Sequence, residues 1–135
     1  MKHILAAIDG SEASFRALDH AAELASLLNA ELTILIVRLV IVGRKDVYAA
    51  VSKEDVEKIE HQARDAALSA GATQVSVVVE TSRDTAYKIV DVAIEKGADL
   101  IVMGASGKGG FKAFLLGSVS QDVLKKSACP VTIVH

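Results

Sequence analysis

The amino-acid sequence predicts one α/β domain, in which a parallel sheet carries helices on both faces. Apolar runs of strand length alternate with longer stretches of helical period along the chain. The run Leu100–Met103 has no polar alternation, which is typical of a strand that is covered on both faces. Because 135 residues suffice for one hydrophobic core but not for two, we expect residues 1–135 to form a single domain.

The elements follow from these two kinds of pattern, taken in chain order. The expected strands are His3–Ile8, Glu31–Val37, Gln74–Glu80, Asp99–Gly104 and Val131–Val134. The expected helices are about Ser11–Leu28, Ser52–Ala70, Thr85–Lys96 and Ser118–Ser127. The first three helices carry apolar residues at i, i+3, i+4 spacing, such as Leu18, Ala21, Ala22 and Ala25 in the first.

Three similar stops mark where helices end and strands begin. Asn29, Gly71 and Gly97 are each followed by Ala, and Gly and Asn tolerate the left-handed backbone that ends helices. Ser52 with Asp55 three residues later has the form of a capping box. The region from about 40 to 51 carries no clear assignment beyond an extended continuation of the second strand.

Composition excludes several classes of function. Fifteen basic against seventeen acidic side chains give a net charge of −2, unlike the basic footprint of a nucleic-acid binder. One cysteine excludes an internal disulfide and suits a reducing compartment. The apolar run Leu32–Val42 is interrupted by Arg38 and is too short to span a bilayer. With no signal peptide at Met1, we expect a soluble, cytoplasmic protein.

The densest cluster of glycines follows the fourth expected strand. It runs from Gly104 to Gly110 and leads through Phe111 to Gly117-Ser118, where the last helix begins. Backbone N–H groups of such a loop can converge on an anion, and the helix N-terminus adds partial positive charge. Lys108 and Lys112 offer further positive charge. A simple strand-to-helix connection explains the glycines as well, and neither a P-loop nor a G-x-G-x-x-G turn is present.

The spacing of these glycines resembles a known family. Gly104, Gly107 and Gly117-Ser118 match the pattern G-x2-G-x9-G-[ST] of ATP-binding universal stress proteins. The segments 7–11, 98–104 and 129–131 are similar to that family in the same order. The resemblance implies an adenine nucleotide alpha hydrolase-like fold, an open five-stranded parallel sheet in the order 3-2-1-4-5. It also implies a homodimer that pairs through the last strand, Val131–Val134.

The resemblance also implies a nucleotide site, with ATP, AMP or ADP as the ligand and Mg²⁺ or Mn²⁺ on the phosphates. Asp9 would lie near the ribose or adenine, although its sequence position also suits a turn or helix-capping residue. The other implied nucleotide-binding residues are Ala7, Ile8, Val37, Met103, Gly104, Gly107, Lys108, Gly117, Ser118 and Val119. The stretch 38–42 is more apolar than is usual in the family, and either covers the adenine side or serves a partner contact.

Three classes of function are compatible with these residues. The first is an ATP-binding stress-response protein, a sensor or switch with an unknown regulatory partner. The second is a slow ATPase or a protein that phosphorylates itself, and the third is an interaction module that binds no nucleotide. His3, His20, His61 and His135 show no metal-ligand spacing, and no catalytic set can be assembled. The glycine pattern favours the first class, with very slow or no turnover.

Overall fold

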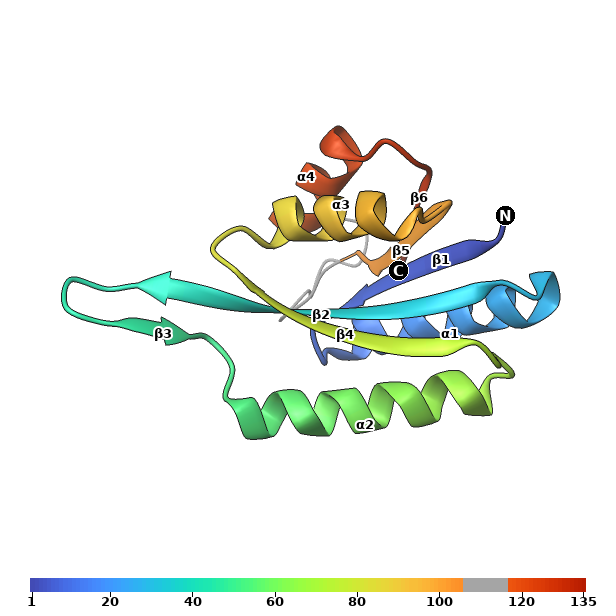
Figure 1. Ribbon diagram of the computed structural model, residues 1–135, viewed down its shortest axis with the longest axis horizontal. Helices are drawn as coiled ribbons and strands as arrows, with labels where there is room; N and C mark the ends of the chain where they lie inside the picture. The colour runs from blue at the N-terminus through green and yellow to red at the C-terminus, as the bar shows by residue number, and fades with distance from the viewer. Residues whose placement is uncertain (106–116) are drawn as a thin grey trace.

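The central sheet consists of five parallel strands in the order β4-β2-β1-β5-β6 (Figure 1). The computed structural model describes residues 1–105 and 117–135. The parallel strands are β1 (His3–Ile8), β2 (Glu31–Val42), β4 (Val75–Ser82), β5 (Leu100–Gly104) and β6 (Val131–Val134). Counted among the parallel strands alone, their order is 3-2-1-4-5, so the expected strand order is confirmed.

Helices cover both faces of this sheet, as expected. Helices α1 (Glu12–Leu28) and α2 (Lys53–Ser69) lie on one face, and α3 (Thr85–Lys96) and α4 (Ser118–Lys126) lie on the other. Strand residues alternate between the two cores, because successive side chains of a strand point to opposite faces. In β1, Ile4 and Ala6 pack on the α1 and α2 side, while Leu5 packs on the α3 and α4 side.

The helix ends confirm the turn chemistry that the sequence predicts. The Ser52 hydroxyl accepts a hydrogen bond from the Asp55 N–H at 3.1 Å, which caps α2. Asn29 and Gly97 end α1 and α3 with φ values of 53° and 65°, in the left-handed region. Gly71 follows α2 with φ 102°. The other expected boundaries agree with the structure to within two residues, except at the end of β2.

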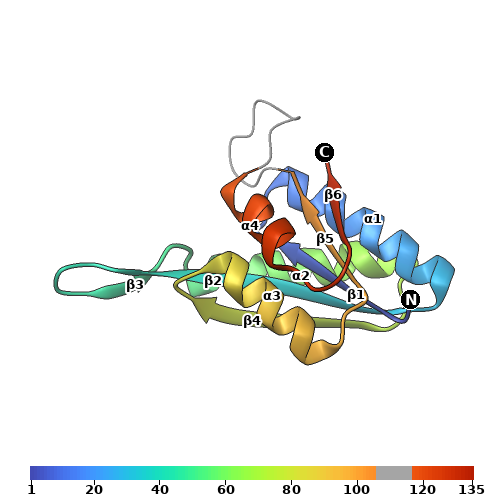
Figure 2. The ribbon, with the colours of Figure 1, turned by 90° about the horizontal axis from the view of Figure 1, so that it is seen from above.

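The second strand is longer than expected, and the chain turns back on it. Instead of ending at Val37, β2 continues to Val42, and β3 (Val47–Ala49) pairs with its end in the antiparallel direction. The turn is closed by a hydrogen bond from the Gly43 N–H to the Asp46 carbonyl, 2.7 Å long. Figures 1 and 2 show this hairpin projecting away from the rest of the domain. The apolar run 39–42 is therefore part of β2, in agreement with the extended continuation that the sequence indicated.

None of the helices in the described ranges is both long enough and apolar enough to cross a membrane.

The amino ends of β1 and β5 are joined by one carboxylate. Asp99 Oδ2 accepts hydrogen bonds from the backbone N–H groups of Lys2, at 2.7 Å, and His3, at 2.9 Å. The Asp99 N–H in turn donates to the His3 carbonyl at 2.8 Å. These two backbone donors, with Lys2 the stronger contributor, lower the pKa of the Asp99 carboxyl.

This lowered pKa predicts a pH dependence of stability. The contribution of Asp99 is full above its ordinary pKa of about 3.9 and is lost as the pH falls through the lowered folded-state value. Asp99→Asn should therefore be less stable than the wild type at pH 7, and the gap should narrow below about pH 4. Urea unfolding over a pH series measures the gap. Asp19→Asn, on the exposed side of α1, is the control. A gap that stays constant down to pH 3 would contradict the assignment.

Candidate functional site

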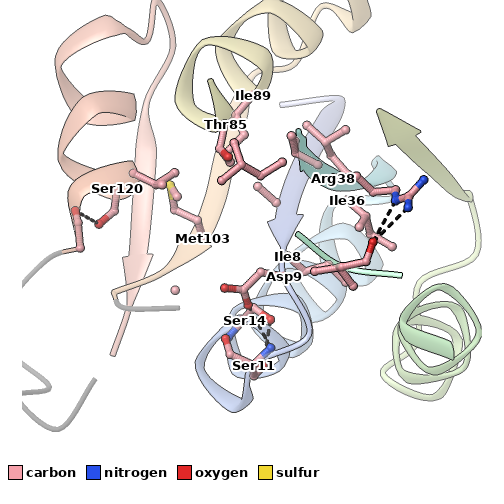
Figure 3. A pocket seen from close by; sticks show the side chains of 18 of the residues that line it. Ile8, Asp9, Ser11, Ser14, Ile36, Arg38, Thr85, Ile89, Met103 and Ser120 are labelled. Atoms are coloured by element: carbon pink, nitrogen blue, oxygen red, sulfur yellow. Dashed lines mark hydrogen bonds between the residues drawn. The ribbon is translucent and has the colours of Figure 1, made fainter. Parts of the chain in front are cut away.

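A pocket lies at the carboxyl ends of β1 and β5 and beside residues 35–39 of β2, with a cavity volume of about 420 Å³. This is the edge where open parallel sheets bind ligands, because strand order reverses there. Here β1 is flanked by β2 on one side and β5 on the other. The chain passes from β1 to β2 through α1 on one face of the sheet, and from β5 to β6 through α4 on the other face. Figure 3 shows side chains from both helix layers around the opening. The volume falls within the range of small-molecule sites, about 300–1,000 Å³.

Sequence-predicted site residues from four separate segments meet at this pocket. Those that line it are Ala7, Ile8, Asp9, Val37, Met103, Gly104, Gly117, Ser118 and Val119. Gly107 and Lys108 lie outside the described residues. The lining brings together positions more than a hundred residues apart in the chain, although what each of them does toward a ligand stays a prediction.

Asp9 forms the turn that the sequence left open as an alternative. Its Oδ1 accepts a hydrogen bond from the Ser11 N–H at 2.9 Å. Gly10, between them, has φ 90°, which favours glycine. Ser11 then caps α1 by accepting from the Ser14 N–H. Asp9 lines the pocket, and within the described residues no hydrogen bond reaches its Oδ2, which keeps its acceptor capacity.

Gly104 has a packing reason that sequence reasoning missed. A Cβ at this position would lie 3.0 Å from both the backbone C and O atoms of Ala13, in the first turn of α1. Only glycine allows β5 to approach the helix this closely. The signal was present as a glycine at a strand end, but the partner backbone cannot be identified without the fold. Gly104 is therefore required by the scaffold, whatever else it contacts.

The start of α4 is fixed directly to the end of β5. The Gly117 N–H donates to the Ala105 carbonyl at 2.8 Å, and the Ser120 hydroxyl donates to the Gly117 carbonyl at 2.9 Å. Gly117 occupies the N-cap position without a side-chain cap. Ser118 and Val119 of the first turn line the pocket, and among the described residues no side chain caps their N–H groups. This end of the pocket can donate hydrogen bonds to a negatively charged group of a ligand.

The opposite end of the pocket is apolar. Leu39, at the base of the hairpin, belongs to the stretch 38–42 that was expected either to cover the adenine side or to serve a partner contact. Sequence reasoning missed the other residues, which are Ala50 and Val51 on the return from the hairpin, Val56 and Ile59 on α2, and Ile89 on α3. The apolar run past Val37 was the available signal, since it showed that the expected strand did not end there. Thr85 and Arg38 add polar groups to this half.

Few charges line the pocket. Among its described lining residues, Asp9 is the one acid and Arg38 the one base. In the described ranges, no group of three or more His, Cys, Asp or Glu side chains is placed to hold a metal ion. The site is thus built from backbone N–H groups at one end and aliphatic side chains at the other. Such an arrangement suits binding of an anionic molecule that carries an apolar or aromatic part.

Comparison with known proteins gives matches over the whole chain. The sequence profile described as the Universal stress protein family matches residues 1–135. The universal stress protein YxiE of Bacillus subtilis is 37% identical over 151 residues, which cover 98% of this chain and 97% of YxiE. The crystal structure of a universal stress protein in complex with cAMP has a TM-score of 0.80 and 30% identity, covering 99% of this chain and 96% of that one. The universal stress protein from Archaeoglobus fulgidus has a TM-score of 0.77 and 26% identity, covering 100% and 94%.

Proposed function

Because the chain belongs to the universal stress protein family, we propose that it is a regulatory protein that binds an adenine nucleotide, with ATP as its ligand. The observation that carries the proposal is the two-part lining of the pocket. Exposed backbone N–H groups at the start of α4 suit phosphates, and the aliphatic half suits a flat base. The relative bound to cAMP, at 30% identity, supports the adenine nucleotide as the class of ligand.

We propose the following arrangement of the nucleotide. The base lies against Val37 and the hairpin return, while Gly104, Ser118 and Val119 approach the ribose and phosphates. A divalent ion, Mg²⁺ or Mn²⁺, would accompany ATP on its phosphates. Mg²⁺ is commonly held by one or two carboxylates together with phosphates and water, and Asp9 is the lining carboxylate that fits this role. The ion would neutralise phosphate charge, and this chain's own residues would orient the base and ribose.

The binding test compares two identical substitutions on neighbouring strands. Val37→Glu places a carboxylate in the pocket and should weaken ATP binding by about 100-fold or more, since the charge loses its hydration against the proposed position of the base. Val79→Glu on β4 is the control, because Val79 is exposed and lies outside the pocket lining. Calorimetry with ATP, AMP and cAMP measures affinity, after chromatography of small molecules released from denatured protein.

An absence of heat with all three nucleotides, or an equal loss in both variants, would contradict the proposal. Amide exchange over β3, measured with and without ATP, tests whether the nucleotide changes a surface that a regulatory partner can contact. This surface is the hairpin, whose Ile41, Val42, Val47 and Tyr48 are exposed. If amide exchange over β3 is unchanged at saturating ATP, the protein binds the nucleotide but does not act as a switch through this surface. We propose that such a switch acts in the cytoplasm.

A second substitution separates the two roles of Asp9. Asp9→Asn keeps an Oδ1 that can accept from the Ser11 N–H, so the turn and the stability of the fold should be retained. It removes the negative charge, so the gain in ATP affinity on adding Mg²⁺ should fall several-fold while AMP binding without metal changes little. Calorimetry with Mg²⁺ and with EDTA measures this gain, and urea unfolding checks the fold. A Mg²⁺ dependence equal to that of the wild type would exclude Asp9 from the metal site.

We also propose a homodimer through β6. This strand pairs with β5 on one edge only, and its other edge has no strand partner among the described residues. The Pro130 and Val134 carbonyls accept from Ile101 and Ala105 of the β5 segment, so the main-chain groups of the alternate residues Val131 and Ile133 face the free edge. A second copy can pair there about a two-fold axis.

The dimer is tested by removing one donor from the free edge. Ile133→Pro deletes an outward N–H and leaves the bonds to β5 in place, so the dimer should dissociate to a chain of 14.2 kDa. Thr132→Ala, at a position whose main-chain groups face β5, is the control. Light scattering measures the mass, and circular dichroism checks the fold. A monomeric wild type, or a dimer that survives Ile133→Pro, would contradict this mode of pairing.

A further inference from the structure

The return segment of the hairpin, Ala50 and Val51, forms one wall of the pocket. It follows β3 and leads into Ser52, the N-cap of α2. Both residues line the cavity, and the Val51 side chain packs at the margin of the core under α1 and α2. Only three residue pairs join β2 and β3, and a two-stranded ribbon of that size is marginally stable by itself. The position of the wall therefore depends on how the base of the hairpin is anchored.

Two ties anchor the segment to β2. The Ala50 N–H donates to the Leu39 carbonyl at 2.8 Å. The Arg38 guanidinium donates to the Val51 carbonyl twice, from Nη2 at 3.0 Å and from Nε at 3.4 Å. The dashed lines beside Arg38 in Figure 3 mark this pair. Within the described part of the chain, Arg38 supplies the hydrogen bonds that the Val51 carbonyl receives.

The chemistry of this contact requires arginine. The planar guanidinium presents Nε and Nη2 in a fixed fork, so both can reach one carbonyl without further loss of side-chain freedom. A lysine offers a single ammonium on a flexible stem, and a methionine offers no donor. Arg38 is half-buried on the strand face that also carries Ile34 and Ile36, which packs toward α1 and α2. The charged group is thus used to hold a backbone position at the pocket edge.

We propose that Arg38 is a positioning residue for the nucleotide: by holding the Val51 carbonyl, it keeps the Ala50–Val51 wall closed against the base. The inference rests on the proposed function, because it assigns the apolar half of that same pocket to the base. Arg38 acts through Val51, and its loss opens the wall without removing any group from the phosphate end. The effect should therefore appear mainly as faster nucleotide release.

The experiment compares Arg38→Met, Arg38→Lys and Arg44→Met. Arg44 lies exposed in the hairpin turn and outside the pocket lining, so its variant controls for loss of a positive charge on the same hairpin. Stopped-flow displacement of a fluorescent ATP analogue by ATP should show release about tenfold faster in Arg38→Met, equivalent to about 1.4 kcal/mol of affinity. Arg38→Lys should recover part of the loss, and Arg44→Met should match the wild type.

A second readout follows the wall itself. Amide exchange of Ala50 in the nucleotide-free protein should be about tenfold faster in Arg38→Met, since the neighbouring tie to Leu39 is left alone to hold the segment. Release rates within about twofold of wild type in folded Arg38→Met would overturn the inference. A wild type that binds no adenine nucleotide overturns the proposed function, and the positioning role falls with it. In that case amide exchange of Ala50 still shows whether the Arg38 side chain holds the Ala50–Val51 segment.

Discussion

The parallel pairing of β1 with both β2 and β5 is the constraint on which the rest of the structure depends. It places Ile8 beside Ile36 and Ala7 beside Met103, so β1 and β5 end at one edge while β2 runs on past them. From β1 and β2 the chain continues to α1 and α2 on one face, and from β5 it continues to α4 on the other. Because two loops diverge at this point, a hollow remains that no side chain of the sheet can fill. The position of the pocket thus follows from the order of the strands and does not depend on particular residue types.

Several residues at this edge serve the scaffold as well as the proposed ligand. Gly104 is required by its approach to the Ala13 backbone, and Asp9 Oδ1 closes the turn into α1. Neither residue type is by itself an argument for nucleotide binding, since packing and turn formation account for both. Three features have no such role in the scaffold among the described residues: the N–H groups of α4 without a side-chain cap, the second oxygen of Asp9 and the aliphatic half of the pocket.

The sequence predicted those parts of the fold that depend on local chemistry. Helix caps at Ser52, Asn29 and Gly97 are set by neighbours a few residues away. The apolar composition of Leu100–Met103 by itself indicates a strand that is buried on both faces. The strand order 3-2-1-4-5 came from the family resemblance, because periodicity does not specify which strands pair. The site residues that were found lie on strands and on the motif. Those that were missed, such as Val51 and Ile59, reach the pocket only through tertiary packing.

The two ends of the pocket are held by different kinds of contact, and this difference bears on how each can change. At the phosphate end, Gly117 bonds to Ala105, which directly continues β5, so that end follows the core of the sheet. At the proposed base end, the Ala50–Val51 wall belongs to a hairpin that projects from the domain. Hydrogen bonds to the Leu39 carbonyl and from the Arg38 side chain hold it to β2. Under the proposed arrangement, an anion site fixed to the sheet and a wall of few contacts would allow the base end to move while the phosphates remain bound. If nucleotide binding controls a partner, the hairpin is therefore the part of this molecule best placed to carry that control.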